Sequence, residues 1–388
     1  MHRGDLARDG HPFTATLDAP AASRLALAWK ARFTGAVDGT PAVGRGLVIA
    51  GSAGGELRAV NAADGSTVWA RHGLGAIAAS PTLSGDRVFA ASLTGYVYAL
   101  DAVSGGQVWT WKGPASAAIW ASPAAYGDEV IVGVASPYGD QPLVPGRLVA
   151  LDAATGHQRW TMCVLLNCAA GGGVWSTPST DEHGYAFVGV GNPVDGVLAF
   201  DPLTGQRKWL SSLYADHGQD LDVGASPVVF DLNREEVVAQ ASNQGLFALL
   251  DATDGGLVWQ RQLVNGSAVH GLLATPAYDT TNLYVASASA PTGLFALKPA
   301  DGATVWHAAT QLPVYSAPAV SNGVVVFGTG AVPESVKAGS IVALSTSDGH
   351  VLFTFDARSA VRSGPAIAGS LVVAGDAAGD LFAFRPKS

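Results

Sequence analysis

The chain has 388 residues, of which only 14% are charged, and it carries a formal net charge of −9. This acidic balance, without any cluster of lysine and arginine, argues against a nucleic-acid surface, and the apolar runs are shorter than the ~20 residues of a membrane helix. Length alone would suggest two or three domains. An internal repeat nevertheless covers nearly the whole chain and predicts a single domain over residues 1–388.

The N-terminal part of the chain contains one isolated strand signal. The first residues, MHRGDLARDG, lack the apolar core of a signal peptide, so the sequence fits either an exported mature chain or a cytoplasmic protein. The segment LALAWKARF, at residues 25–33, then reads as an aromatic strand with no repeat unit in front of it. We therefore expect residues 25–33, with Trp29, to complete the last unit of the repeat.

The repeat itself is a strand, a tight Asp/Gly turn and a second strand that ends in a large aromatic residue, as in ALDAATGHQRW at residues 150–160. This combination is typical of a β-hairpin. We expect the closing aromatics to pack each unit against the next, as a tryptophan docking motif. They are Trp69, Trp109, Trp160, Trp209, Trp259, Trp306 and Phe353.

A second phrase, one or two small residues and then a proline, precedes each hairpin and marks eight units. These prolines are Pro41, Pro81, Pro123, Pro178, Pro227, Pro276, Pro318 and Pro365. Another apolar strand lies between the two phrases, which gives four short strands in each unit of 40 to 55 residues. The pattern predicts an all-β fold, an eight-bladed β-propeller of four-stranded antiparallel blades, whose ring is closed by the N-terminal strand.

The two cysteines of the chain, Cys163 and Cys168, lie in CVLLNC on an expected loop between two blades. Their spacing permits a disulfide bond, whereas a metal site would need two further ligands that the local sequence does not supply. We expect a local disulfide bond if the protein is exported.

The position three residues before each proline should lie at one mouth of the central channel, where the innermost strands begin. A narrow central channel can be filled by small side chains, but five of these positions carry large or charged residues. We interpret the five as a ligand pocket; the alternative is that the aromatic side chains only fill the channel mouth. The five are Asp38, Trp120, Trp175, Tyr315 and Arg362. His217 and His270 are also expected near this mouth, although a lone histidine is more often a hydrogen-bonded surface residue.

The repeat is most irregular between residues 163 and 227, which contain GGGVWSTPSTD at 171–181, FVGVGNP at 187–193 and DHGQDLDVGASP at 216–227. Together with the repeat, these motifs resemble the quinoprotein dehydrogenases, eight-bladed propellers that bind pyrroloquinoline quinone (PQQ) and calcium, and in particular their polyvinyl-alcohol-dehydrogenase-like branch. The repeat alone is also similar to the outer-membrane assembly lipoprotein BamB, which is not catalytic.

The resemblance implies roles for individual residues. Trp175 would stack under the quinone, Asn192 would be a calcium ligand, and Asp222 would be both a calcium ligand and the general base, with Asp220 as the second choice for these two roles. Calcium prefers such hard oxygen ligands, and a carboxylate can remove the alcohol proton as hydride leaves. The same family places its members in the periplasm or outside the cell.

Three features of the family's site differ in this chain. The loop expected to carry a calcium-binding glutamate reads ASPYGDQPLVPG and offers only Tyr138 or Asp140. The adjacent cysteine pair that covers the quinone is absent, and Asn243 stands where the family has a basic residue that holds the quinone oxygens. Independently of the family, Asn192 followed by Pro193 also fits a simple turn, and Asp220 and Asp222 fit caps of loop amides.

Three functions therefore remain open. The first is a PQQ- and calcium-dependent oxidoreductase for an alcohol or polyol, and the second is a propeller that binds a ligand or protein without catalysis. The third is a diverged enzyme without quinone that uses Asp222, His270 or Tyr315 as acid or base. In each case we expect a monomer without a membrane span that binds a small molecule at a pocket formed by Asp38, Trp120, Asp220, His270, Tyr315 and Arg362.

Overall fold

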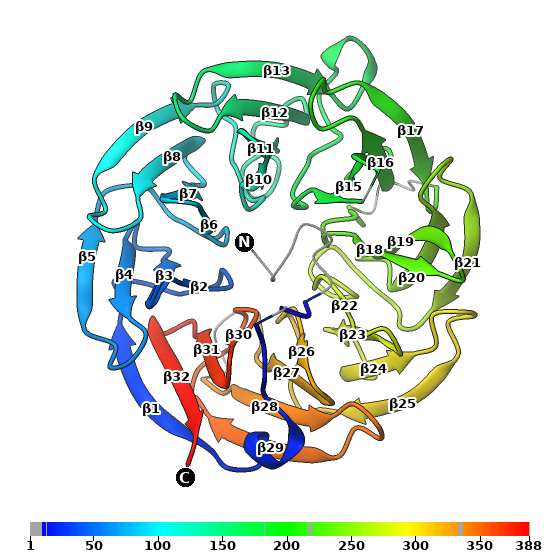
Figure 1. Ribbon diagram of the computed structural model, residues 1–388. Helices are drawn as coiled ribbons and strands as arrows, with labels where there is room; N and C mark the ends of the chain where they lie inside the picture. The colour runs from blue at the N-terminus through cyan, green and yellow to red at the C-terminus, as the bar shows by residue number, and fades with distance from the viewer. Residues whose placement is uncertain are drawn as a thin grey trace.

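The computed structural model describes residues 10–12, 14–181, 183–215, 218, 220–332 and 337–387. The chain forms eight four-stranded antiparallel sheets arranged as blades around a central channel (Figure 1). The predicted eight-bladed propeller is therefore confirmed. No helix in the described part of the chain is long and apolar enough to span a membrane.

The blades follow one another in chain order, and the innermost strand of each comes first. Blades 1 to 4 consist of β2 (Ala42–Gly44), β3 (Leu47–Gly51), β4 (Leu57–Asn61) and β5 (Thr67–Arg71); β6 (Thr82–Ser84), β7 (Arg87–Ala91), β8 (Tyr96–Asp101) and β9 (Gln107–Lys112); β10 (Ala124–Tyr126), β11 (Glu129–Val134), β12 (Arg147–Asp152) and β13 (Gln158–Cys163); and β14 (Ser179–Thr180), β15 (Ala186–Val190), β16 (Gly196–Phe200) and β17 (Arg207–Ser212).

Blades 5 to 8 repeat this order, except that the last blade takes its outermost strand from the N-terminal part of the chain. They consist of β18 (Val228–Leu232), β19 (Glu235–Ala241), β20 (Leu246–Asp251) and β21 (Leu257–Gln262); β22 (Ala277–Tyr278), β23 (Leu283–Ser287), β24 (Gly293–Leu297) and β25 (Thr304–Ala309); β26 (Ala319–Ser321), β27 (Val324–Gly328), β28 (Ser340–Ser345) and β29 (Val351–Asp356); and β30 (Ala366–Ala368), β31 (Leu371–Gly375), β32 (Asp380–Pro386) and β1 (Leu25–Arg32).

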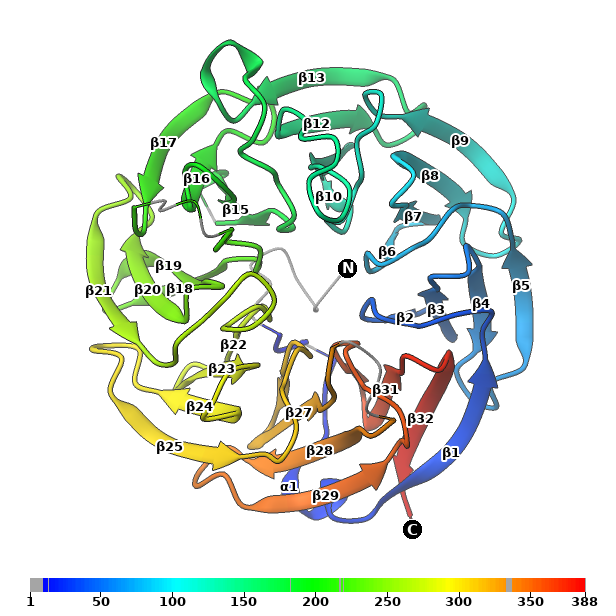
Figure 2. The same ribbon diagram turned by 180° about the vertical axis from the view of Figure 1, so that it is seen from behind.

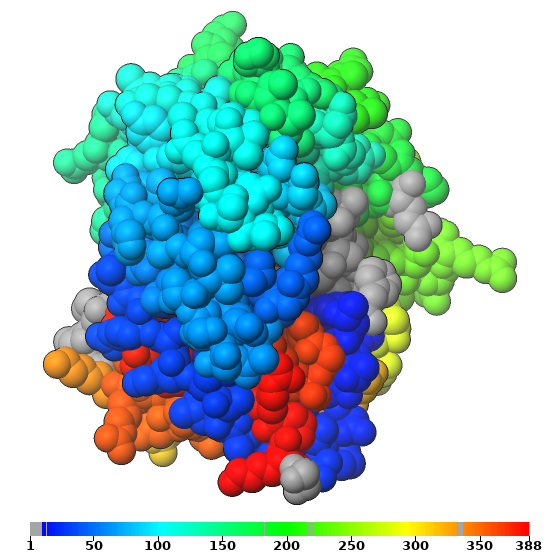
Figure 3. Space-filling view, turned by 60° about the vertical axis from the view of Figure 1, so that its left-hand side comes forward, coloured from blue at the N-terminus to red at the C-terminus, as the bar shows by residue number. Residues whose placement is uncertain are grey.

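The ring is closed by pairing between the two ends of the chain. Strand β1 runs antiparallel to β32, from the pair Leu25 and Pro386 to the pair Arg32 and Asp380. Figure 3 shows the blue residues of the N-terminal strand against the red residues of the C-terminal strand. Asp380 also forms ion pairs with Lys30 at 3.3 Å and with Arg32 at 3.1 Å. The predicted closure by the strand around Trp29 is thus confirmed.

Tryptophans on the outer strands connect each blade to the next. The indole nitrogen of Trp29 donates to the carbonyl of Ala62, and equivalent bonds of 2.8–3.1 Å recur around the ring. Each indole also covers a turn glycine of the next blade, where an added Cβ would lie 2.5–2.8 Å from the ring. The donor and acceptor pairs are Trp29–Ala62, Trp69–Ala102, Trp109–Ala153, Trp160–Pro202, Trp209–Ala252, Trp259–Pro299 and Trp306–Thr346.

The eighth connection is different because Phe353 has no N–H group. Its ring packs edge-on against Phe384 of blade 8 with centroids 5.5 Å apart, and Phe355 packs against both Phe382 and Phe384. Blade 7 is therefore joined to blade 8 by aromatic contact rather than by an indole hydrogen bond.

Hydroxyl side chains connect the inner strands in the same direction. The residue before the proline is Ser or Thr in blades 1 to 6, and the N–H of each of the first five donates to the hydroxyl oxygen of the next. These pairs are Thr40–Ser80 at 2.8 Å, Ser80–Ser122 at 3.0 Å, Ser122–Thr177 at 2.9 Å, Thr177–Ser226 at 2.9 Å and Ser226–Thr275 at 3.1 Å. We call this series the hydroxyl belt. It ends at blades 7 and 8, where Ala317 and Gly364 occupy the position.

The apolar core lies between the blades. In the described part of the chain, buried side chains form eight clusters, one between each pair of neighbouring blades. Each central strand is covered on both faces by the neighbouring blades. Its residues are therefore buried at successive positions and do not alternate between apolar and polar, as in β11, β15 and β27. The ring is thus held by packing between blades.

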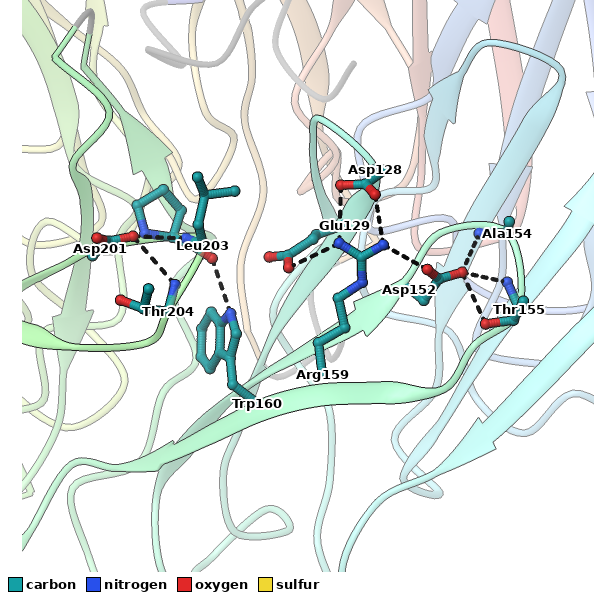
Figure 4. Close-up of polar contacts among 11 residues, drawn as sticks. Asp128, Glu129, Asp152, Ala154, Thr155, Arg159, Trp160, Asp201, Leu203 and Thr204 are labelled. Atoms are coloured by element: carbon teal, nitrogen blue, oxygen red, sulfur yellow. Dashed lines mark hydrogen bonds and ion pairs between the residues drawn. The ribbon is translucent and has the colours of Figure 1, made fainter.

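One charged cluster connects the strands of blade 3 at the rim. Arg159 contacts Asp128 at 2.6 Å, Asp152 at 2.6 Å and the buried Glu129 at 3.2 Å (Figure 4). Burial raises the pKa of Glu129, and the hydrogen bond from Arg159 opposes this shift. A separate hydrogen bond from Arg159 to Asp152, with those from Thr155, lowers the pKa of Asp152. The guanidinium thus compensates a carboxylate that the fold has removed from water.

Residues 10–12 and 14–18, which precede the short helix α1 (Ala19–Ala22), lie against blades 7 and 8 at the edge of the channel, on the face seen in Figure 1. The N–H of Val320 donates to the carbonyl of Gly10, and the N–H of Gly369 donates to that of Thr14. Beneath this segment lies a cavity of about 240 Å³, lined by inner-strand residues of blades 1, 7 and 8. Blades 7 and 8 are the two that lack the hydroxyl of the belt, and blade 1 follows them in the ring.

Ring closure can be tested by deleting residues 1–33. We expect a lower melting temperature and association into dimers or larger species, because the backbone groups of β32 become an open sheet edge. Thermal unfolding and size-exclusion chromatography measure the two effects. Leu27→Ala, which shortens an exposed side chain of β1, is the control and should leave both unchanged. A deletion protein that stays monomeric with the original melting temperature contradicts this role of β1.

The hydroxyl belt can be tested at Ser122. Ser122→Ala removes the acceptor of the Ser80 N–H in a buried position and should lower the free energy of unfolding by about 1–3 kcal/mol. Ser122→Thr keeps the hydroxyl, as Thr177 does in the next blade, and should behave much more like the wild type. Denaturant unfolding of the three proteins measures the difference, and equal stability of Ser122→Ala and wild type would show that the belt contributes nothing.

Candidate functional site

The candidate site lies at the channel mouth on the face opposite α1, which Figure 2 presents to the viewer. Two of the predicted residues, Trp120 and Trp175, lie together with ring centroids 5.8 Å apart and an interplanar angle of 17°. The indole nitrogen of Trp120 donates to the carbonyl of Ser136 at 2.9 Å, which fixes that ring. Both rings are partly exposed. They form a flat aromatic surface above the inner strands of blades 3 and 4.

Asn192 and Asp222, which come from blades 4 and 5, are in direct contact. The N–H of Asn192 donates to Oδ1 of Asp222 at 2.9 Å, and the residue Asp222 is only 6% exposed. The side-chain N–H₂ of Asn192 donates to Oδ1 of Asp220 at 3.3 Å. Its Oδ1 is buried without a hydrogen-bond donor. The structure therefore brings the three residues predicted for calcium binding into one cluster.

Gly191 determines how closely Asp222 can approach. A Cβ at Gly191 would lie 2.3 Å from Oδ1 of Asp222, which no real side chain could do. The N–H of Gly191 donates to the carbonyl of Gly173 at 2.9 Å, and a Cβ at Gly173 would lie 2.6 Å from Nε1 of Trp175. Gly173 and Gly191 thus connect the aromatic surface to the oxygen cluster.

Asp220 is electrostatically linked to the loop that follows β11. Burial raises the pKa of Asp220, the charge of Asp140 raises it further, and the hydrogen bond from Asn192 opposes both effects. Asp140, one of the two candidates in the ASPYGDQPLVPG loop, is therefore close enough to Asp220 for their charges to interact.

Asn243, which stands where the family has a basic residue for the quinone oxygens, forms hydrogen bonds with backbone groups. Its N–H donates to the carbonyl of Asp222 at 3.1 Å, and its side chain donates to the carbonyl of Ala268 at 3.2 Å. Tyr214, which the sequence analysis did not select, supports the same segment because its hydroxyl donates to the carbonyl of Leu221. Burial raises the pKa of Tyr214. The only sequence signal for it was its place just before the irregular segment at residues 216–227.

The remaining predicted residues form a second group, from blades 6, 7, 8 and 1. Nε of Arg362 contacts Oδ1 of Asp38 at 2.9 Å. The rings of His270 and Tyr315 are 6.4 Å apart, and the Tyr315 hydroxyl donates to the carbonyl of Val269 at 3.0 Å. Burial raises the pKa of Tyr315, and the charge of Arg362 opposes this shift. His217 lies outside the described residues.

The predicted disulfide bond between Cys163 and Cys168 is present, on the loop between β13 and β14. Within the described part of the chain, no three His, Cys, Asp or Glu side chains are grouped so that they could hold a metal ion. A cation at the mouth would thus depend on mixed ligands, with the amide oxygen of Asn192 beside the carboxylates. Such oxygen sets suit calcium rather than a transition metal.

Comparisons with known proteins agree with this architecture. The model of the family described as outer membrane protein assembly factor BamB matches residues 21–167, 75–268 and 244–388. A polyvinylalcohol dehydrogenase of a Pseudomonas species is 29% identical over 300 residues, which cover 58% of this chain and 46% of that protein. This chain thus matches about half the length of that relative.

Two solved structures are similar in fold at 17% identity. The quinohemoprotein alcohol dehydrogenase from Comamonas testosteroni gives a TM-score of 0.86, with 99% of this chain and 80% of that chain covered. A europium-containing methanol dehydrogenase gives a TM-score of 0.85, with coverage of 99% and 97%. At this identity the likeness establishes the propeller fold alone.

The contact between Gly191 and Asp222 leads to a prediction. Gly191→Ala should lower the free energy of unfolding by about 1–3 kcal/mol, because the new Cβ displaces the carboxylate or the strand. It should also speed hydrogen exchange of the Asn192 amide, which loses its acceptor. Gly224→Ala is the control, since a Cβ there has no neighbour within 4 Å. Unchanged stability and exchange in Gly191→Ala would mean that the site does not need this close approach.

Proposed function

We propose that this chain, which belongs to the family described as outer membrane protein assembly factor BamB, is a quinoprotein-type oxidoreductase that oxidises an alcohol or polyol at the channel mouth. The observation that carries this proposal is the cluster of Asn192, Asp220 and Asp222 next to the stacked Trp120 and Trp175. The names of the similar proteins, polyvinylalcohol dehydrogenase and quinohemoprotein alcohol dehydrogenase, support the same reaction class.

The residues fit a calcium ion. Asn192 Oδ1 is a buried carbonyl oxygen without a donor, and a hard cation would satisfy it. Asp220 and Asp222 would supply carboxylate oxygens beside this amide oxygen. Trp175 would form the stacking floor for a flat quinone. Bound there, PQQ would accept a hydride and calcium would polarise its reactive carbonyl.

Asp222 is the residue to which we assign general-base catalysis. Its carboxylate is buried, and the Asn192 N–H fixes its direction, so it can accept the alcohol proton at one defined place. Asn243 and Tyr214 hold the backbone of this segment. Trp120 would exclude water from one side of the pocket. The residues of the second group, Arg362 among them, would line the opposite side of the mouth and contact the substrate.

The disulfide bond supports a periplasmic or secreted location, since such bonds persist in oxidising compartments. A propeller that binds a ligand without catalysis is the alternative function. The engagement of Asn243 with the Ala268 carbonyl favours it, because a side chain that binds backbone does not replace the missing basic residue.

The proposal can be tested with PQQ and Ca²⁺ added together. A ligand at 100 times its dissociation constant should stabilise the protein by about 2.7 kcal/mol, which raises the melting temperature. Asp222→Ala should abolish dye-linked alcohol oxidation, because it removes a calcium ligand and the base. Trp175→Ala should weaken PQQ binding, and Asp220→Ala should have a much smaller effect on both.

Asp231→Ala, at an exposed position of β18, is the matched control and should retain the wild-type thermal shift and activity. If the wild-type protein shows no shift with PQQ and Ca²⁺, the oxidoreductase assignment is wrong. A shift without oxidation of any alcohol would instead favour the binding propeller.

A further inference from the structure

The disulfide-closed loop lies directly behind the candidate site. Cys163 ends β13, and the loop that follows protrudes at the rim between β13 and β17 (Figure 2). Leu166, in the middle of the loop, is 82% exposed, whereas Val164 is completely buried in the core between blades 3 and 4. The loop thus has an outer part in solvent and an inner part that packs against the blade.

The inner part of the loop contacts the glycine segment, residues 171–173. A Cβ at Gly172 would lie 2.9 Å from Cγ1 of Val164 and 3.1 Å from Cγ of Leu165. Leu165 is also 3.6 Å from the Cβ position of Gly171. No side chain fits between the loop and the glycine segment, so a displacement of Val164 or Leu165 leaves that segment without its support.

The glycine segment in turn contacts two residues of the candidate site. The N–H of Gly172 donates to the carbonyl of Asn192 at 2.5 Å, and the carbonyl of Gly173 accepts the N–H of Gly191. Gly173 also lies against the indole nitrogen of Trp175. A continuous series of contacts therefore runs from the disulfide loop through three glycine residues to Asn192 and Trp175.

Two other contacts hold the base of the loop. The N–H of Val164 donates to the carbonyl of Gly146 at 3.0 Å, and Nη2 of Arg207 donates to the carbonyl of Cys163 at 3.3 Å. These bonds fix Cys163 and Val164, while the disulfide bond fixes the far end of the loop at Cys168. Leu165 lies between these fixed points, and its position depends on both.

From these contacts we infer that the Cys163–Cys168 disulfide bond is a positioning element of the candidate site. It keeps Val164 and Leu165 against the glycine segment. This holds Asn192 in the position that would bind the cation and Trp175 in the position that would stack on the quinone. The inference rests on the proposed function, because it takes Asn192 to be a ligand of calcium. Reduction of the bond would loosen the site locally, since a disulfide bond that closes a short loop contributes only modestly to global stability.

The experiment compares oxidised wild-type protein, the same protein reduced by a dithiol, and the variant Cys163→Ser/Cys168→Ser. Two electrons and two protons from the dithiol convert the Sγ–Sγ bond into two thiols, and the dithiol is oxidised to its cyclic disulfide. Hydrogen exchange of the Gly172 and Asn192 amides should be about tenfold faster in both altered proteins. Exchange in β31 of blade 8, on the opposite side of the ring from blade 4, should not change.

Calorimetry with Ca²⁺ alone should show an affinity several-fold weaker after reduction, and reoxidation should restore it. The dithiol should have no further effect on the double variant. Leu166→Ser, which retains the bridge and changes only an exposed side chain, is the matched control and should exchange and bind as the wild type does. If the double variant does not fold, the reduced wild-type protein carries the test.

The results separate this inference from the proposed function. Equal protection of Gly172 and Asn192 in oxidised and reduced protein overturns the positioning role, whatever the Ca²⁺ affinity. If oxidised protein binds no Ca²⁺, the proposed function is wrong at that site, and the exchange of the two amides alone then decides whether the disulfide bond positions Asn192.

Discussion

The structure depends on the contact between an outer tryptophan of one blade and a turn glycine of the next. Each indole lies where a glycine Cβ would be and donates its N–H to a carbonyl of the same turn, as Trp69 does with Gly105 and Ala102. These glycines have positive φ, so the turn and the contact require the same residue. The tight Asp/Gly turn of each hairpin is therefore also the docking surface for the preceding blade.

This contact explains why the channel mouth can vary. The outer tryptophans and the hydroxyl belt connect the blades at two radii, and each belt residue stands two positions after the mouth position of its blade. The belt includes Ser122, Thr177 and Ser226 in the blades whose loops diverge most. Because these connections are intact there, the loops above them can carry Trp175, Asn192 and Asp222 instead of packing residues.

The ring was predictable from the sequence because its determinants are local and repeated. The prolines, the Asp/Gly turns and the closing aromatics recur in each unit, and the unpaired strand around Trp29 matched the incomplete last unit. The neighbours Asn192 and Asp222 could also be selected, because the resemblance to the quinoprotein dehydrogenases assigns a role to a residue of each of their motifs. The structure confirms that Asn192 and Asp222 are neighbours; their roles in calcium binding and catalysis are a proposal.

Other features of the site depend on contacts between distant loops, which no local pattern encodes. Asn243 stands at the position expected for a cofactor contact, but the loop at Ala268 comes close enough to take its side chain. Asp140 and Asp220 are 80 positions apart in sequence, and only the fold over the mouth brings their charges together.

The glycines of the mouth show the same limit. In the sequence, the glycines at 172, 173 and 191 indicate only a turn or a loop. In the structure each is required, because another group occupies the space that its Cβ would take. For Gly172 this group is Val164, for Gly173 it is Trp175, and for Gly191 it is Asp222. The residues of the channel mouth are thus held by glycine backbone, which lies closer to Val164, Trp175 and Asp222 than any residue with a side chain could. A carboxylate as buried as Asp222 can keep a fixed direction there because its support is backbone, which has fewer alternative conformations than a layer of packed side chains.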